Sequence, residues 1–181
     1  ETTYRAKLDS TLKEIEAVKG MLSKDEVYAH PKFVSALTEY IVEDFKKSRI
    51  MFSDDSIGGM IVCDSSQQAK TVFEELQKYE ELSKILILHD VDDKETRKNE
   101  QEDFKEGKID LVVVYNMWLT GFDAPRLKKI YLGRVIKAHN LLQTLTRVNR
   151  PYKDYRYGYV VDFADIRDEF DKTNKAYFEE L

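Results

Sequence analysis

Leu111-Val112-Val113-Val114-Tyr115 is an unbroken apolar run rich in β-branched residues. Such a run is suited to a central strand buried on both faces of a parallel sheet. Further segments on either side of it are typical of strands, at residues 60–63, 84–89, 129–132 and 159–163. Segments typical of helices lie between them, at residues 66–80, 92–105 and around Gln143. This alternation predicts an α/β fold with a mostly parallel sheet.

Two helices are expected before the first strand. Apolar residues recur at helical spacing over residues 4–18 and again over residues 33–45, and Pro31 suits the first position of the second helix. Residues 53–59, with two glycines, are expected to form a polar loop. We divide the chain into an N-terminal helical segment or linker (1–29), an α/β lobe (30–166) and a C-terminal helix leading to a further domain (167–181).

Composition restricts the class of protein. The chain has 181 residues, of which 42% are hydrophobic and 35% charged, as in a soluble globular domain. No apolar run approaches the ~20 residues that span a bilayer, and no secretory signal is visible. Cys63 is the only cysteine, which favours a reducing, cytoplasmic setting and an inert core position for this thiol. Because the chain begins at Glu1 and not at Met, we expect it to be a piece of a longer protein.

The charge is unevenly distributed. The net charge of −5 argues against a general nucleic-acid coat protein. Residues 126–156, however, carry nine lysines and arginines and one acid, a net charge of +8, which leaves −13 for the rest. This basic stretch predicts a localised polyanion site, and the alternative is a solvated surface without a ligand.

Gln143-Thr144-Leu145-Thr146-Arg147-Val148-Asn149-Arg150 predicts an amphipathic helix. Gln143, Arg147 and Arg150 fall within an arc of roughly 60° at about 100° per residue, with apolar residues opposite. Two guanidiniums on one face suit a phosphate or a carboxylate. Structural ion pairs with neighbouring acids are the alternative. Because Arg150 precedes Pro151, the helix is expected to end there.

A second candidate lies in residues 119–125, Leu-Thr-Gly-Phe-Asp-Ala-Pro, after the strand that ends at Tyr115. Gly121 permits close backbone approach and Pro125 stiffens the exit. Asp123 is expected at a strand carboxyl end, where ligands bind in such sheets and where it can accept a hydrogen bond from a ribose hydroxyl. The alternative is a turn aspartate bonded to its own backbone.

Ser65 and Ser66 follow a strand and open a helix, so either is a candidate helix cap, and the free amides there suit a phosphate. Three scattered histidines, including His89 and His139, and one cysteine have no metal-ligand spacing, so we predict no structural metal. The chain has no G-x-x-x-x-G-K-[ST] phosphate loop and no Asp-Glu pair after a strand. It should therefore not hydrolyse ATP alone.

These segments resemble a known family. Residues 119–125 resemble motif V, and residues 143–150 motif VI, of superfamily 2 helicases and translocases. Thr-Gly-Phe-Asp-Ala-Pro followed by Gln-x-x-x-Arg-Val-Asn-Arg-Pro-Tyr is characteristic of the motor subunit of type I restriction enzymes. Asn149 stands where the usual motif VI has glycine, as expected in this subfamily. The resemblance extends over residues 30–166 and is specific over residues 120–152.

The resemblance implies the second RecA-like lobe of the motor, a three-layer sandwich with N-terminal helices. ATP and Mg²⁺ would be held mainly by a first RecA-like lobe that carries the phosphate loop. Arg147, Arg150 and Gln143 would then be catalytic, Gly121 and Asp123 would contact the nucleotide, and Ser65, Ser66 and Thr120 would contact the DNA backbone.

The implied function is ATP-dependent translocation of duplex DNA by the restriction subunit of a type I restriction endonuclease. That subunit would also carry a nuclease domain and join methylation and specificity subunits. Two alternatives stay open: the C-terminal lobe of another superfamily 2 DNA or RNA helicase, and a non-catalytic domain that retains the fold. In every case the isolated chain is predicted to be inactive.

Overall fold

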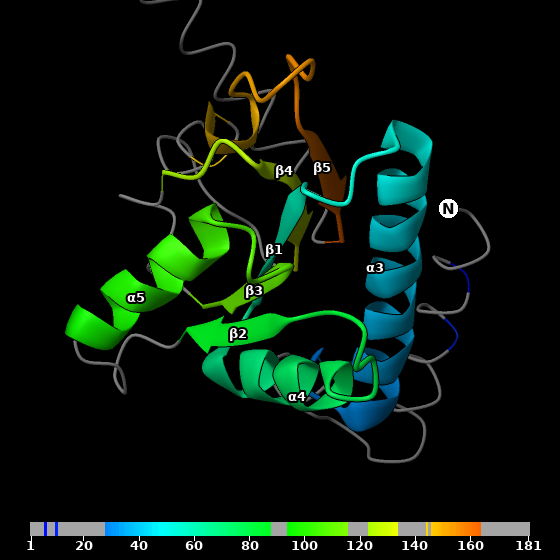
Figure 1. Ribbon diagram of the computed structural model, residues 1–181. Helices are drawn as coiled ribbons and strands as arrows, with labels where there is room; N and C mark the ends of the chain where they lie inside the picture. The colour runs from blue at the N-terminus through cyan, green and yellow to red at the C-terminus, as the bar shows by residue number, and fades with distance from the viewer. Residues whose placement is uncertain are drawn as a thin grey trace, which may run out of the picture.

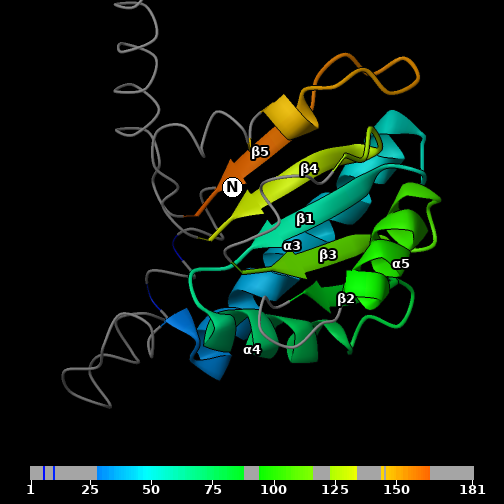
Figure 2. The ribbon, with the colours of Figure 1, turned by 90° about the vertical axis from the view of Figure 1, so that its left-hand side faces the viewer.

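The computed structural model describes Ala6, Ser10 and residues 28–87, 94–115, 123–133, 144 and 146–163. Its centre is a five-stranded sheet of order β2-β3-β1-β4-β5, in which all four strand pairs are parallel (Figures 1 and 2). The strands are β1 (Gly58–Val62), β2 (Lys84–Ile87), β3 (Leu111–Val114), β4 (Leu127–Leu132) and β5 (Tyr159–Asp162). The predicted α/β fold with a parallel sheet is confirmed, and β1, β3 and β4 are entirely buried.

The helices α3 (Pro31–Phe52), α4 (Ser66–Leu76) and α5 (Lys94–Lys105) accompany the sheet. Helix α3 begins where the sequence predicted, because Pro31 occupies its first turn and the His30 Nδ1 accepts a hydrogen bond from the Lys32 amide at 3.2 Å. It ends at Ser53, whose left-handed φ of 50° lets its amide close the last turn.

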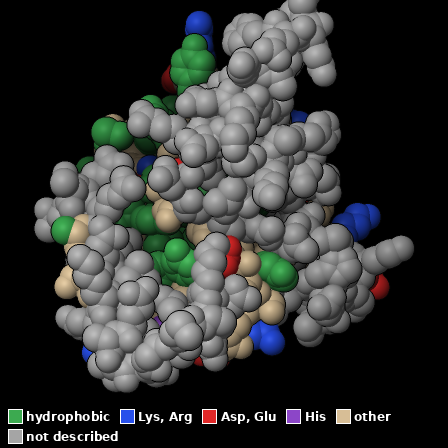
Figure 3. All heavy atoms as spheres, turned by 180° about the vertical axis from the view of Figure 1, so that it is seen from behind, with side chains coloured by type: hydrophobic (Ala, Val, Ile, Leu, Met, Phe, Trp, Pro, Cys, Tyr) green, Lys and Arg blue, Asp and Glu red, His purple; other side chains and the backbone are tan. Residues whose placement is uncertain are grey.

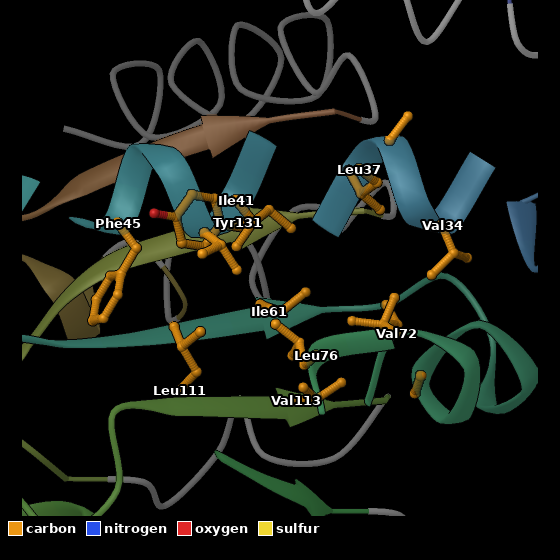
Figure 4. Packing of buried hydrophobic residues seen from close by; sticks show 14 of the residues in the cluster. Val34, Leu37, Ile41, Phe45, Ile61, Val72, Leu76, Leu111, Val113 and Tyr131 are labelled. Carbon is orange, nitrogen blue, oxygen red and sulfur yellow. The ribbon is translucent and has the colours of Figure 1, made fainter. Parts of the chain in front are cut away.

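The sheet is covered on both faces, as three layers require. On one face α3 and α4 pack against β1, β3 and β4 through Leu37, Ile41, Leu76, Ile61 and Val113, among others (Figure 4). On the other face, Phe104 of α5 and Val148 pack against the alternate side chains of the same strands, such as Met60 and Val112. Successive strand residues therefore serve two different cores, which explains the unbroken apolar runs.

The loop predicted at residues 53–59 ends earlier than expected. Gly58 and Gly59 are the first two residues of β1 and are buried. A Cβ at Gly58 would lie 2.5 Å from the Phe104 ring, and one at Gly59 would lie 2.7 Å from a methyl group of Leu111. The two glycines thus mark a close approach of both cores to the strand and not a turn.

Other predictions have mixed outcomes. Cys63 is buried, and burial raises the pKa of its thiol, which confirms an inert core residue. The helices predicted over residues 4–18 and 167–181 lie outside the described residues, except for Ala6 and Ser10, which are helical. The division at residues 29 and 166 stays a prediction. In the described ranges no helix is long and apolar enough to cross a membrane.

Candidate functional site

Asp123, Arg147 and Arg150 lie together in the structure, and we call them the charged cluster. The Nη1 of Arg150 forms an ion pair with the Oδ1 of Asp123, and both side chains are accessible, at 44% and 62% exposed. Arg147 is half-buried beside them. Burial and the Arg150 guanidinium lower the pKa of Arg147, whereas the Asp123 carboxylate raises it. Arginine stays charged at neutral pH despite such a shift, so the cluster carries an excess of positive charge.

The charged cluster lies near the amino end of β4. Asp123 precedes the first residue of β4, Leu127, by four positions, and the Leu127 amide donates to the Ala124 carbonyl at 3.0 Å. The prediction that Asp123 sits at a strand carboxyl end is wrong. Ala124 and Leu127 are buried at the amino end of β4, and they hold the neighbouring Asp123 at this end of the sheet.

The helix that carries the arginines is shorter than predicted. It ends at Val148, and Asn149 and Arg150 form a bend before Pro151. The residue before a proline disfavours the helical conformation, so Arg150 leaves the helix and turns to Asp123. Thr144 and Val148 are buried one turn apart, which fixes the face of the helix that meets the sheet.

A buried lysine holds the main chain of this bend. Lys128, 2% exposed in β4, donates from Nζ to the carbonyl of Val148 at 3.2 Å and to the carbonyl of Arg150. Burial lowers the pKa of Lys128. The ammonium thus satisfies carbonyls that the end of the helix leaves without an internal partner.

The chain after Pro151 is fastened to the loop between α3 and β1. The Tyr152 hydroxyl donates to Ser56 Oγ at 2.9 Å, and Lys153 Nζ lies 3.0 Å from Asp54 Oδ2 and 2.6 Å from Ser56 Oγ. Burial raises the pKa of Asp54, but hydrogen bonds from Ser56 and Lys153 outweigh it and lower that pKa to about 2. Tyr155 adds a hydrogen bond from its hydroxyl to the Phe52 carbonyl at 2.9 Å.

Gly158 packs directly against the helix that carries Arg147 and ends at Val148, which we call the arginine helix. This helix and the bend at Asn149 and Arg150 together form the arginine segment. A Cβ at this position would lie 2.3 Å from the Val148 carbonyl oxygen and 2.5 Å from the Val148 Cβ. No side chain larger than hydrogen fits there without a shift of the backbone. The chain directly before β5 therefore limits how closely the arginine segment and β5 can approach each other.

Ser65 and Ser66 lie at the opposite end of the sheet from the charged cluster. They follow the carboxyl end of β1, about one strand length away, or roughly 15 Å. Ser65 is the cap of α4, since its Oγ accepts from the Gln68 amide at 3.0 Å. Figure 3 shows the molecule from behind, which is the side toward which the strands point in Figure 1. Among the described residues, this face shows many hydrophobic and few basic side chains. The DNA contact of Ser65 and Ser66 stays a prediction.

The basic stretch is less available to a ligand than its sequence suggests. Arg126, Lys128 and Lys129 are 3%, 2% and 6% exposed. The Arg126 guanidinium donates to three carbonyls, and Lys129 Nζ pairs with Asp44 Oδ2 at 2.6 Å. These three cations bind groups inside the lobe, so they are not available to a polyanion at the surface.

Some predicted site residues cannot be placed. Gln143, Gly121 and Thr120 lie outside the described residues, as do His89 and His139. Among the residues that the structure describes, no group of three His, Cys, Asp or Glu side chains could hold a metal ion. The geometry therefore assembles three of the eight predicted residues in one cluster and places two at the other end of the sheet.

The model of one protein family, described as "Type I restriction enzyme subunit R domain 3", matches residues 21–165. The chain belongs to this family. A putative type I restriction enzyme endonuclease subunit, MjaIXP, of Methanocaldococcus jannaschii is 30% identical over 91% of this chain. A Staphylococcus aureus endonuclease subunit, SauCOLORF180P, is 35% identical over 44% of it. The chain spans 17% and 9% of the length of these two relatives.

Solved structures show that this R-subunit domain has the fold of a helicase lobe. Domain 2 of the Mss116p DEAD-box helicase, solved bound to an RNA duplex, matches 83% of the chain at a TM-score of 0.57 and 17% identity, with 56% of that chain covered. The Pyrococcus furiosus Hef helicase domain matches 97% at a TM-score of 0.52 and 15% identity, with 38% covered. The domain thus has the fold of the RecA-like C-terminal lobe of superfamily 2 helicases, as the resemblance implied.

Sequence reasoning missed the groups that hold the arginines in place. Lys128 and Lys153 were counted only as charges, and Gly158 was not singled out. Gly158 stands in a Tyr-Gly-Tyr sequence directly before a strand, where a glycine points to close backbone approach, and that signal was available. The role of Lys128 had no such signal, because its partners are main-chain carbonyls 20 and 22 residues away.

Proposed function

We propose that this R-subunit domain is the second motor lobe of an ATP-dependent duplex-DNA translocase within a type I restriction endonuclease. The observation that carries the proposal is the charged cluster, in which Arg147 and Arg150 meet Asp123 on a helicase-type lobe. ATP would bind between this lobe and a first lobe of the same subunit. Methylation and specificity subunits would supply recognition of the DNA site.

The described residues fit one half of a nucleotide site. Two neighbouring guanidiniums complement phosphate charge, and Asp123 can accept a hydrogen bond from a ribose hydroxyl. By the resemblance, Mg²⁺ would be held mainly by the first lobe, together with the phosphates of the nucleotide. Gln143, Gly121 and Thr120 keep their proposed roles by resemblance alone.

The Asp123–Arg150 ion pair gives the cluster its order. Arg150 follows the last helical residue by two positions, and a side chain at such a bend would otherwise sample many rotamers. The carboxylate of Asp123 restricts it and offsets part of the repulsion between the two guanidiniums. Arg150 is therefore held in place before any nucleotide arrives, which is what electrostatic stabilisation of a transition state requires.

Translocation and ATP turnover by the full-length subunit test the proposal. We expect the full-length subunit, in its complex with the other subunits, to displace a triplex-forming strand from duplex DNA when ATP is present. We expect the isolated chain to show no ATP turnover. ATP-driven unwinding of RNA without movement on duplex DNA would instead favour a helicase of another kind, and robust turnover by the pure chain would contradict the split site.

A further inference from the structure

A buried lysine of β4 binds the main chain of the arginine segment. Lys128 is the second residue of β4, is 2% exposed, and carries the ammonium that binds the carbonyls of Val148 and Arg150. These carbonyls flank the end of the arginine helix, where intrahelical partners run out. Positive charge at a helix carboxyl end also interacts favourably with the helix dipole.

This lysine is placed at an energetic cost. Burial is the only cause that shifts its pKa, and the shift is downward. Within the described ranges no carboxylate forms an ion pair with Lys128. An apolar side chain would fill a buried strand position without that penalty, so the hydrogen bonds to the arginine segment are what the ammonium contributes.

The neighbouring lysine of β4 makes the contrast clear. Lys129 is also buried, but it points to the opposite face of the sheet and pairs with Asp44 of α3 at 2.6 Å. The Tyr131 hydroxyl donates to the same carboxylate at 2.8 Å. Lys129 thus fastens α3 to the sheet, whereas Lys128 fastens the arginine segment.

We propose that Lys128 is a positioning residue for the arginine fingers. By holding the carbonyls of Val148 and Arg150, it fixes the main chain on which Arg147 and Arg150 are mounted. The side chain of Arg150 is then fixed by Asp123 and its backbone by Lys128, so the guanidinium is held at both ends. The inference rests on the proposed function, because it assigns Lys128 a role through the arginines.

Lys128→Met, Lys129→Met and Arg147→Ala in the full-length subunit test the inference, with kcat and KM for DNA-dependent ATP hydrolysis and thermal unfolding as readouts. Arg147→Ala should lower kcat by about 1,000-fold or more. Lys128→Met should lower kcat by about 10- to 100-fold, the scale of a misplaced catalytic group, with KM for ATP within about twofold. Lys129→Met should change kcat by less than about twofold at a temperature where the protein stays folded, since it disturbs only the α3 face.

Lys128→Arg is the control that separates a positioning role from misfolding, because a guanidinium can also donate hydrogen bonds to both carbonyls. We expect it to recover at least about half of the kcat that Lys128→Met loses on a logarithmic scale. Wild-type kcat in Lys128→Met beside an inactive Arg147→Ala would overturn the positioning role and leave the proposed function intact. Equal losses in Lys128→Met and Lys129→Met, or a Lys128→Arg protein no more active than Lys128→Met, would reduce Lys128 to a stabilising residue. Wild-type kcat in Arg147→Ala would overturn both.

Discussion

Arg126 joins four parts of the lobe, and its replacement by methionine is the most demanding test of the fold. Its Nε donates to the Ser56 carbonyl at 2.8 Å, and its Nη1 donates to the carbonyls of Phe104 and Ile109, each at 2.7 Å. The guanidinium also stacks over the Phe104 ring at 4.6 Å. One side chain thereby ties the start of β4 to the α3–β1 loop, to the end of α5 and to the segment before β3.

The loss can be worked from these contacts. A hydrogen bond to a charged group contributes about 1.5–3 kcal/mol, so three such bonds set an upper bound of roughly 5–9 kcal/mol. Methionine keeps apolar contact with Phe104 and avoids the cost of burying a cation, which offsets part of the loss. We expect Arg126→Met to lower the free energy of unfolding by about 3–5 kcal/mol. For a chain of this size that corresponds to a fall in Tm of about 6–20 °C.

Urea unfolding of the chain, followed by circular dichroism, measures this difference. Arg156→Met is the matched control, because Arg156 is exposed and its loss should change the free energy by no more than about 0.5 kcal/mol. If Arg126→Met were as stable as Arg156→Met, the buried guanidinium would not organise the lobe as its contacts indicate.

Two further predictions concern the arginine segment and its fastening. Gly158→Ala should lower the free energy of unfolding by about 1–3 kcal/mol, because its Cβ would lie 2.3 Å from the Val148 carbonyl oxygen; urea unfolding checks this. Asp54 has a folded pKa of about 2, below its ordinary 3.8, so its contribution is present above pH 4 and is lost as pH falls through 2. Asp54→Asn should therefore cost about 1–2 kcal/mol more at pH 6 than at pH 2.5 in unfolding measurements, a value reduced from the full shift because Lys153 is half exposed.

Each of these has a clear contrary result. Unchanged stability in Gly158→Ala would mean that the chain directly before β5 does not pack closely against the arginine helix. A stability difference between wild type and Asp54→Asn that is equal at both pH values would mean that the carboxylate is not held in its charged form by Ser56 and Lys153.

The sequence predicted the sheet well because its three central strands, β3, β1 and β4, are buried on both faces. Leu111–Val114 and Gly58–Val62 serve two cores through alternate side chains, which favours an apolar residue at each position. Helix α3 was predictable from its His30-Pro31 start and its apolar spacing. Gly58 and Gly59 were misplaced in a loop, since their role depends on Phe104 and Leu111, which are distant in sequence.

The sequence singled out Arg147, Arg150 and Asp123, and the structure places these three side chains together. Their roles toward a nucleotide stay a prediction, and the residues that hold their main chain were not predicted. Arg150 nevertheless lies beyond the helix end, in a bend before Pro151. The number of basic residues did not predict that Arg126, Lys128 and Lys129 are buried. Their partners, which are main-chain carbonyls and the Asp44 carboxylate, approach them only after folding.

We propose that the arginines of the charged cluster act on a nucleotide. The most direct measurement is the single-turnover rate of hydrolysis of ATP already bound to the full-length subunit on duplex DNA, for wild type and Arg147→Ala. We predict a rate lower by about 1,000-fold or more, with the affinity for ATP changed by less than about tenfold, because the arginine stabilises charge that develops in the transition state. Hydrolysis at the wild-type rate would show that Arg147 does not stabilise this charge.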